Sequence, residues 1–551
     1  MLKRPAALIA ILSLITIPIY SVNAAVKAGA TCTKLNQTQV YKDLTFKCIK
    51  SGKKLIWDKG TKTVQQVVAK EGDTCQKMGQ TFTTSSSILE CRKIAGNLLS
   101  LVTITNNFSA VTNPASPDAY TVCRLADKRP VFPIGTLSIA YPPKPFANFK
   151  TATGKFKIVV VGIDFSDVQG TGDPSILWNA DIKKINEWLK WYSNDKVSFD
   201  FVTYSKWIRA SKVSSAYDAT NNSDKSPSAG QIGGLTAQQI TDDYISAIED
   251  SVDLSNTTGI WIYFPPNISK ITGAFTAQTA GYQSKKYGLI SAQLVTGSAD
   301  LYLSKRASWA FYLHEIMHGF GIQGHSPKFL PANGFTRIGE MSTADGWSNA
   351  LLPWDALIWG VEKPEDLYCI DKPHLTSVDL KLVPLEREQI GIRSAMVKLN
   401  DHQVLVVESH RTDKWGVGEG AGFAAVMVSV IDVKVSTSWD NEQTGRSPCT
   451  TSTGVYLKVD GADHGNHQAI GSPLLNNGQT YIGVGVVNGV GIAGDYEQWD
   501  TNHLMYLGES IKVAGLKVSL IGSGDNDTVR IENIDPNVSE FQQLPIPSQC
   551  K

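Results

Sequence analysis

The hydrophobic residues between positions 155 and 264 follow two alternating patterns. Continuous apolar runs, typical of strands buried on both faces, occupy residues 155–164 and 259–264. Apolar residues at helical spacing occupy residues 178–192, and a second helix is expected over 236–250, where Thr236 can cap the first turn. Strands that alternate with helices predict an α/β domain in this part of the chain.

The pattern changes near residue 378, where short segments of alternating hydrophobic and polar residues begin. Turn residues such as Asn477 and Gly478 separate these segments. The segments occupy residues 404–408, 423–433, 481–487, 511–521 and 529–531. This arrangement predicts an all-β sandwich of about one domain's length.

The N-terminal region contains an internal repeat. Cys32 and Cys48 are 16 positions apart, Cys75 and Cys91 have the same spacing, and the flanking residues match when the sequence is shifted by 43 positions. Each copy is too small to hold a hydrophobic core unaided, so we expect Cys32–Cys48 and Cys75–Cys91 disulfides to stabilise two small β modules. These modules are candidates for binding cell-envelope material or for acting as spacers.

The even number of cysteines, eight, indicates four disulfides in an exported chain. Besides the repeat pairs, Cys123, Cys369, Cys449 and Cys550 allow three pairings. We favour Cys369–Cys449 together with Cys123–Cys550, because the second bond would tie the C-terminal end to the start of the α/β region.

The first 24 residues have the features of a secretory signal peptide. Lys3 and Arg4 precede an apolar run over residues 8–20, and small residues end at Ala24. The run is short for a membrane span, so cleavage after Ala24 is favoured over an uncleaved anchor. We therefore expect a secreted or envelope-associated protein. Its net charge of +1 gives no support for binding to nucleic acid or to an anionic membrane surface.

The strongest chemical signal is the stretch HEIMHGFGIQGH, which lies at the end of a helix expected over residues 304–318. On a helix, His314 and His318 lie on one face and can bind one metal ion together. Glu315 lies beside the first ligand and can act as general base. Gly319 and Gly321 allow a sharp turn that returns His325 as a third ligand. Zinc fits this set best, because catalytic zinc takes three protein ligands and keeps one position open.

The chain resembles the immune inhibitor A-like secreted metallopeptidases over about residues 155–531. The stretches that carry the resemblance stand in the family's order, and they are GKFKIVVVGIDFSD, HEIMHGFG, GEMS, LLPWDALIWGV and VLVVESHR. The resemblance implies a metzincin-like catalytic domain that acts on proteins or peptides. It also implies that Met341, in the GEMS stretch, forms the turn beneath the zinc.

The sequence departs from the metzincin pattern at the third ligand. Metzincins place it at the sixth residue after the second histidine, which is Gly324 here, whereas His325 follows one position later. His325 is our candidate for the third ligand, with Glu340 or Asp345 as alternatives.

These observations predict a multidomain protein. The expected parts are a signal peptide at residues 1–24, two small cysteine repeats at 25–60 and 61–105, a linker at 106–118, a zinc metallopeptidase domain at 119–375 and a β-sandwich domain at 376–551. The expected reaction is hydrolysis of peptide bonds, in which zinc polarises the carbonyl and Glu315 moves the proton of the attacking water.

Two alternatives remain at this point. The first is a non-catalytic envelope-binding protein with a structural metal site, although a structural site has no use for a base at Glu315. The second concerns an additional ion: Asp525, Asn526 and Asp527 could bind Ca2+ through their oxygen atoms, and a turn between two strands explains them equally well.

Overall fold

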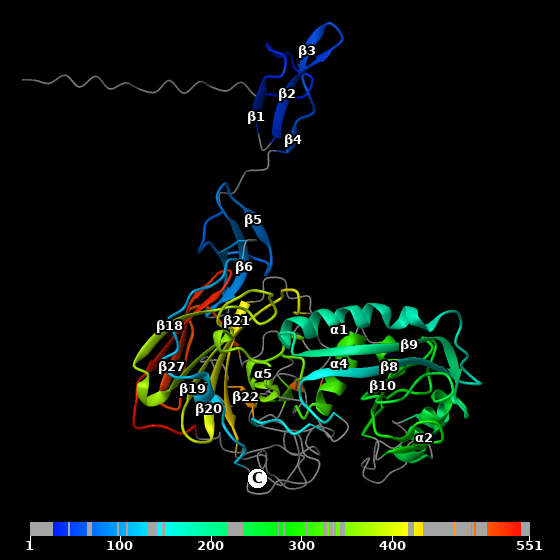
Figure 1. Ribbon diagram of the computed structural model, residues 1–551. Coiled ribbons are helices and arrows are strands. Elements are labelled where there is room, and N and C mark those ends of the chain that lie inside the picture. The colour runs from blue at the N-terminus through cyan, green and yellow to red at the C-terminus, as the bar shows by residue number, and fades with distance from the viewer. Residues whose placement is uncertain are drawn as a thin grey trace, which may run out of the picture. The chain divides into compact units, whose positions relative to one another are not determined.

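A computed structural model describes the fold of the chain. It describes residues 26–41, 44–62, 69–95, 98–105, 108–128, 140–145, 149–218, 235–273, 275–278, 281–303, 307–322, 328–329, 334–335, 338–341, 348–416, 424–433, 467–469, 486–487, 490–491 and 504–541. The chain divides into two compact units, Met1–Ala69 and Lys70–Lys551, which are described separately. The fold is mixed α/β, with many sheets and few helices (Figure 1).

The first unit is a small antiparallel sheet. Its strands are β1 (Thr38–Tyr41), β2 (Leu44–Ser51), β3 (Lys54–Trp57) and β4 (Thr61–Lys62). The core is little more than Phe46 and Trp57 packed around the Cys32–Cys48 disulfide. The predicted bond and the predicted short strands are therefore confirmed.

The second repeat has the same form and belongs to the second unit. Its strands are β5 (Thr81–Thr83), β6 (Ile88–Ile94) and β7 (Leu98–Ile104), and the predicted Cys75–Cys91 disulfide is present. This copy is attached to the C-terminal β region. The backbone N–H of Ala95 donates to the carbonyl of Leu507 at 2.9 Å, and Arg92 donates to the carbonyl of Gly524 at 2.6 Å.

A five-stranded sheet organises the α/β region. In spatial order its strands are β11 (Phe275–Gln278), β14 (Gln293–Thr296), β10 (Gly259–Tyr263), β8 (Gly154–Asp164) and β9 (Val197–Arg209). The strands β14, β10, β8 and β9 are parallel, and β11 is antiparallel to β14. The expected strands at residues 155–164 and 259–264 are confirmed, and they lie side by side at the centre of the sheet.

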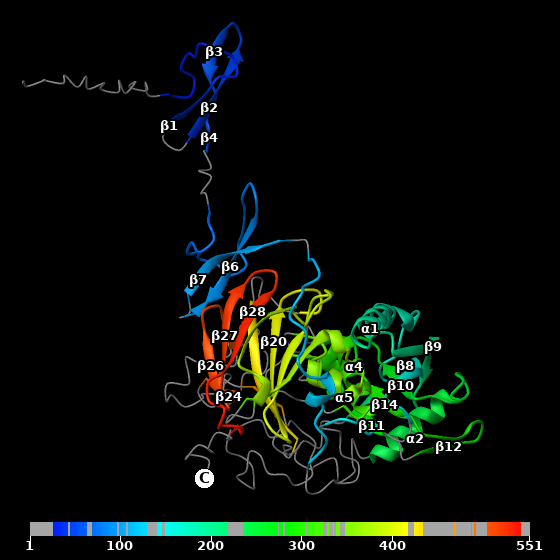
Figure 2. The ribbon, with the colours of Figure 1, turned by 60° about the vertical axis from the view of Figure 1, so that its left-hand side comes forward.

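Helices cover both faces of this sheet (Figure 2). Helices α1 (Asn179–Tyr192) and α4 (Ser308–Gly319) share a core with one face, and α2 (Ala237–Ile248) packs on the other. The two helices predicted over residues 178–192 and 236–250 are confirmed. Thr236 caps α2 as expected, in a reciprocal capping box with Gln239.

Several short elements lie in the α/β region or beside β17 (Leu367–Asp371). They are α3 (Ala299–Leu303), the hairpin of β12 (Tyr282–Ser284) and β13 (Gly288–Ile290), and the short 3-10 helices η3 (Pro174–Leu177), η4 (Ser214–Tyr217), η7 (Pro364–Asp366) and η8 (Lys372–His374).

Two sheets form the C-terminal β region. The larger contains β16 (Gly334–Phe335), β15 (Lys328–Phe329), β22 (His467–Ala469), β21 (Ala424–Asp432), β20 (Gln403–Arg411), β19 (Ser394–Lys398) and β17 (Leu367–Asp371), with β25 (Leu504–Met505) beside β21. The smaller contains β18 (Ser377–Leu382), β28 (Asp527–Asn533), β27 (Leu516–Ser523) and β26 (Ser510–Val513). A separate hairpin joins β23 (Val486–Val487) to β24 (Val490–Gly491).

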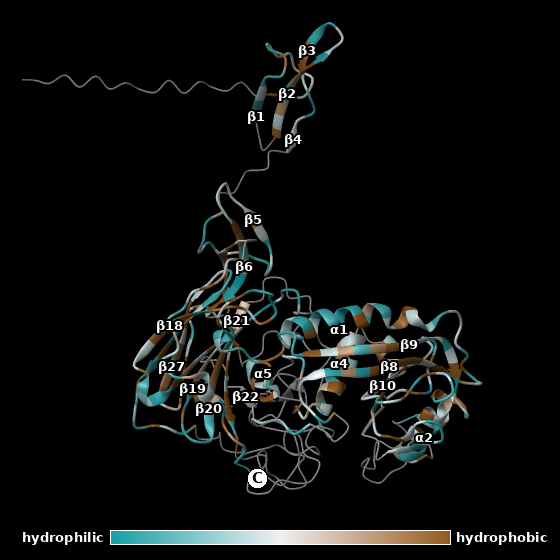
Figure 3. Cartoon of the chain, in the orientation of Figure 1, coloured by the Kyte–Doolittle hydropathy of each residue, from teal (hydrophilic) through white to brown (hydrophobic). Residues whose placement is uncertain are grey.

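The larger sheet is covered on both faces. One face shares a hydrophobic core with the smaller sheet, and the other packs against helix α5 (Pro353–Trp359) (Figure 3). All nine residues of β20 and all nine of β21 are therefore buried, although the sequence pattern was interpreted as alternating hydrophobic and polar positions. The contact with α5 joins the β region directly to the part of the chain that carries the HExxH stretch.

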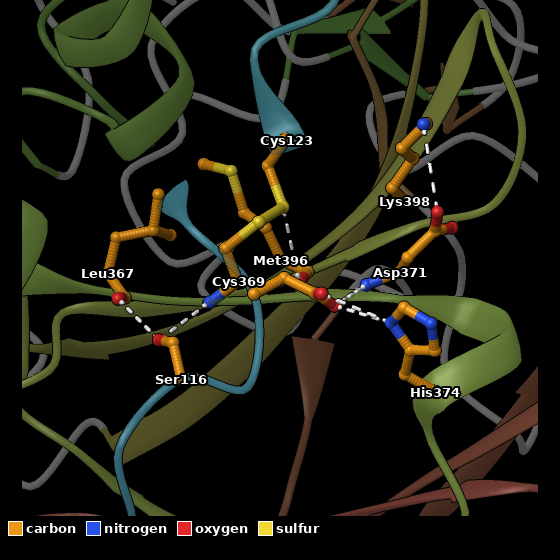
Figure 4. The surroundings of a disulfide bond; sticks show 9 residues. Ser116, Cys123, Leu367, Cys369, Asp371, His374, Met396 and Lys398 are labelled. Atoms are coloured by element: carbon orange, nitrogen blue, oxygen red, sulfur yellow. Dashed lines mark hydrogen bonds and ion pairs between the residues drawn. A yellow bond between two sulfur atoms is a disulfide. The ribbon is translucent and has the colours of Figure 1, made fainter. Parts of the chain in front are cut away.

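The third disulfide differs from our prediction. Cys123, which ends the short 3-10 helix η2 (Tyr120–Cys123), is bonded to Cys369 on β17 rather than to Cys550 (Figure 4). The preceding segment runs along β17, because Ser116 accepts a hydrogen bond from the backbone N–H of Cys369 at 3.2 Å and Asp118 accepts one from Asp371 at 2.8 Å. The pairing of Cys369 with Cys449 is therefore wrong as well. Cys449 and Cys550 lie outside the described residues.

The expected signal peptide also lies outside the described residues. Within the part of the chain that the structure describes, no helix is long and apolar enough to cross a membrane. The three disulfides agree with the oxidising compartment that the cysteine count indicates.

Candidate metal centre

Helix α4 carries the HExxH residues and is anchored at both ends. It begins at Ser308, four residues later than the sequence pattern indicated, and Ser308 donates to Asp181 of α1 at 2.7 Å. Tyr312 donates to the carbonyl of Ile262 on β10 at 2.7 Å. Near the other end, Gln293 of β14 donates to the carbonyl of Glu315. These contacts fix the rotation of the helix, and with it the direction of the histidine side chains.

The rings of His314 and His318 lie together, as their spacing predicts. Their centroids are 4.8 Å apart and their planes are nearly perpendicular, at 89°. Glu315 is half-buried beside them. The arrangement brings two imidazoles and one carboxylate to the last turns of a single helix.

Backbone carbonyls orient both rings. Nδ1 of His314 lies 2.8 Å from the carbonyl oxygen of Glu340, and Nδ1 of His318 lies 3.2 Å from that of Ile322. A proton on each Nδ1 makes these contacts hydrogen bonds and places the lone pair on Nε2, the atom that would ligate a metal. Burial, reinforced by the neighbouring His314, lowers the pKa of His318 to about 3. His318 is therefore neutral at physiological pH, as a metal ligand must be.

Glu340 contacts the candidate site through its backbone. Its side chain is fully buried and accepts a hydrogen bond from Asn349 at 2.7 Å, and burial raises the pKa of its carboxyl well above the usual range. Among the described residues, no group of three His, Cys, Asp or Glu side chains could hold a metal ion. The visible role of Glu340 is thus to orient His314. The other candidates for the third ligand, His325 and Asp345, lie outside the described residues.

Met341 follows Glu340 directly and is completely buried. It belongs to the same hydrophobic core as Met317 of α4 and Ile338. The backbone N–H of Glu340 donates to the carbonyl of Ala350 at 2.8 Å, which fixes the turn that contains Met341. The sulfur-containing side chain therefore packs in the core behind the histidine helix.

Two glycines at the C-terminal end of the helix, Gly319 and Gly321, are required by the close approach of neighbouring atoms. A Cβ on Gly319 would lie 2.1 Å from the ring of Phe149. Gly321 has a left-handed backbone, with φ of +83°, and a Cβ there would lie 2.4 Å from the carbonyl oxygen of Lys144. The helix therefore ends at a left-handed glycine, as predicted, and the turn brings the carbonyl of Ile322 to His318. The expected return of His325 lies outside the described residues.

The variant Gly321→Ala is expected to reduce both stability and zinc affinity. A left-handed alanine alone costs about 1–2 kcal/mol, and the backbone of Lys144 cannot move away as a flexible side chain would. Displacing the carbonyl of Ile322 should lower zinc affinity roughly 10–100-fold. Gly172→Ala is the matched control, because Gly172 has φ of +68° with nothing within 4 Å of its Cβ position. Thermal unfolding and zinc titration of both variants measure the difference, and equal effects would contradict the steric argument.

A cluster of buried ionisable side chains lies behind the turn that contains Met341, and we did not identify it from the sequence. The backbone N–H of Asn349 donates to the carbonyl of Trp415 at 2.8 Å, and the backbone N–H of Trp415 donates to the backbone carbonyl of Glu386 at 3.0 Å. The carboxylate of Glu386 lies 2.7 Å from Nδ1 of His410, and Nε2 of His410 lies 3.4 Å from Glu408. All three ionisable side chains are completely buried. The signal was the VLVVESHR stretch on β20, whose charged residues interrupt an apolar run.

The charges around His410 predict a pH dependence of stability. Burial alone would lower the pKa of His410, but the carboxylates of Glu386 and Glu408 outweigh it and raise the pKa to about 9. The protonated His410 stabilises the folded protein fully at pH values below about 6.5, the pKa of histidine in the unfolded chain. This stabilisation is lost as the pH rises towards 9. Across that window, the free energy of unfolding should fall by on the order of 3 kcal/mol.

Denaturant unfolding of wild type and His410→Gln at several pH values tests this. Glu362, whose pKa burial raises to about 8, contributes in the same direction, so the difference between the two proteins is the quantity to compare. Parallel pH profiles would show that His410 does not carry the effect.

The two aspartates considered for calcium have protein partners, whereas the buried side-chain oxygen of Asn526 has no hydrogen-bond partner among the described residues. Asp525 accepts hydrogen bonds from the N–H and the hydroxyl of Thr105, both at 2.6 Å. Both oxygens of Asp527 lie 2.7 Å from the guanidinium of Arg411. These contacts fasten the turn between β27 and β28 to its neighbours, and the calcium site stays a prediction.

Comparison with known proteins adds no family to this picture. No protein-family model matches the sequence, and no curated protein matches it. The resemblance to the immune inhibitor A-like peptidases stays a prediction that rests on the motifs, and the function has to be argued from the residues around His314 and His318.

Proposed function

We propose that the protein is a zinc-dependent endopeptidase of the immune inhibitor A-like kind. One observation carries the proposal: two histidines one helical turn apart have their Nδ1 atoms held by backbone carbonyls, with Glu315 between them. A histidine that binds zinc almost always gives its other ring nitrogen to such a partner. A surface helix with chance histidines has no reason to orient both rings in this way.

The residues present fit zinc. His314 and His318 would bind through Nε2, and the low pKa of His318 means that no proton has to be displaced from that ring. His325 is our candidate for the third position, and three protein ligands with one open position are typical of catalytic zinc. Two features support a metzincin-like catalytic domain. The turn that contains Met341 is buried, and helix α4 shares a hydrophobic core with the five-stranded sheet.

The chemical role of each group follows from the side chains present at the site. When bound, zinc would polarise the scissile carbonyl and lower the pKa of the attacking water to about 7. Glu315 would accept the proton of that water and pass it to the leaving amine. His314 and His318 would keep their orientation through the carbonyls of Glu340 and Ile322.

Hydrolysis of casein and of a peptide library by the purified chain tests the proposal. Activity that disappears with a zinc chelator and returns on adding zinc supports it. A protein that binds zinc and cleaves none of these substrates would overturn it, and would favour a structural metal site in an envelope-binding protein.

A further inference from the structure

The first unit has a net positive charge, whereas the rest of the chain has a net negative charge. Residues 26–62 contain nine lysines, no arginine and two aspartates, which gives a net charge of +7. The other residues contain 43 basic and 49 acidic side chains, so their net charge is −6. The whole-chain value of +1 conceals this difference.

The described lysines of this unit are exposed. They are Lys27, Lys34, Lys47, Lys50, Lys53, Lys54 and Lys59. Four of them lie on β2, β3 and the turn that joins these strands. Asp58 accepts hydrogen bonds from the backbone N–H groups of Lys47 and Gly60, both at 2.9 Å, so its carboxylate holds the local backbone. The described surface of the unit is thus rich in exposed lysine.

The second repeat provides an internal comparison with the same fold. Its matching residues, 69–105, contain four basic and three acidic side chains. Lys47 corresponds to Glu90, and the half-exposed Ile49 corresponds to Arg92, which is only 4% exposed and bonded to the β region. One copy therefore has the residues of an attached structural module. The other has the same disulfide and strands with a lysine surface, so the fold alone does not require the lysines.

We propose that residues 26–62 bind a linear polyanion, a polymer of closely repeated phosphate or carboxylate groups. Lysine is a compact point charge without the planar fork with which arginine recognises single anions, so a lysine-only surface suits a repeating charge rather than one specific group. Such binding gains free energy from the release of counterions. A membrane surface fits less well, because the described residues of this unit form strands and present no amphipathic helix.

The test uses the whole mature chain with inorganic polyphosphate and polygalacturonate as probes and neutral dextran as a blank. The module variant changes four lysines, as Lys47→Gln, Lys50→Gln, Lys53→Gln and Lys54→Gln. The control changes four exposed lysines of the other unit, as Lys183→Gln, Lys190→Gln, Lys206→Gln and Lys512→Gln. The module variant and the control variant have the same net charge, so they differ only in where the lysines are replaced.

Wild type should bind at least one of the two polyanions with a steep salt dependence. The module variant should bind at least 10-fold more weakly, and the slope of log affinity against log salt should fall by about 3, as expected for four lost contacts. Equal losses in the control variant, or no binding by wild type, would overturn the proposal. Binding to vesicles that contain phosphatidylglycerol but to neither polymer would replace it with a membrane contact.

Two further measurements keep the result interpretable. Peptide mapping should show the Cys32–Cys48 bond intact in the module variant, which separates lost binding from misfolding. Cleavage of a short peptide should be unchanged, because the lysines lie outside the unit that carries Glu315. The polyanion proposal therefore stands or fails independently of the peptidase proposal.

Discussion

Replacing Glu315 by glutamine is expected to slow peptide-bond hydrolysis by a factor on the order of 10²–10⁴, the usual share of a positioned general base. The amide keeps the shape of the side chain but cannot accept the proton. The protein should still fold and bind about one zinc per chain, because the ligands and the carbonyls that orient them are unchanged. Zinc content by elemental analysis and cleavage rate must be measured on the same samples.

Substitution of a zinc ligand, unlike Glu315→Gln, should remove the zinc itself. His318→Ala should lose zinc and activity together, because two remaining protein ligands hold the ion poorly. His325→Ala should do the same if that residue is the third ligand. Retention of zinc in His325→Ala, with its loss in Glu340→Gln or Asp345→Asn, would move the assignment to that residue. A fully active Glu315→Gln would refute the proposed mechanism.

The variant Asp527→Ala is expected to reduce the free energy of unfolding by about 3–5 kcal/mol, because it leaves a buried guanidinium without its partner. Asp527 is fully buried, and its two oxygens each lie 2.7 Å from Arg411. It also accepts a hydrogen bond from Ser409 at 2.8 Å, and the charge of Arg411 holds the pKa of its carboxyl below the usual value despite burial. The pair joins β20 of the larger sheet to β28 of the smaller.

The same strand offers a matched control. Asp379 pairs with Arg530 of β28 in the same two-bond geometry, at 2.7 Å for both contacts, but the two side chains are 46% and 45% exposed. Asp379→Ala should therefore cost less than about 1 kcal/mol. Denaturant unfolding of both variants measures the difference. A cost for Asp527→Ala as small as that of Asp379→Ala would show that burial does not determine the strength of these pairs.

Local patterns predicted the parts of this fold that depend on neighbouring residues. The helices near 178–192 and 236–250 and the strands near 155–164 and 259–264 follow from periodicity, and the repeat disulfides follow from equal spacing. The pairing of His314 with His318 follows from one helical turn. Each of these features is determined within a short stretch of chain.

Features that join distant segments were not predictable in this way. Cys123 meets Cys369 only because Ser116 and Asp118 bond to the edge of β17, which no pattern in either segment reveals. The carbonyls that orient the two histidines, and the buried charges around His410, likewise come from backbone placement. The positive net charge of the first unit can be counted from the sequence, but the net charge of the whole chain conceals it.

The Cys123–Cys369 bond has a consequence for the integrity of the molecule. It closes a covalent loop of 246 positions that contains the whole five-stranded sheet and helix α4. A single proteolytic cut anywhere in that loop leaves both fragments attached to each other. Nicked molecules would therefore migrate as one species until a reductant separates the pieces, so proteolytic damage inside the α/β region need not release any part of it.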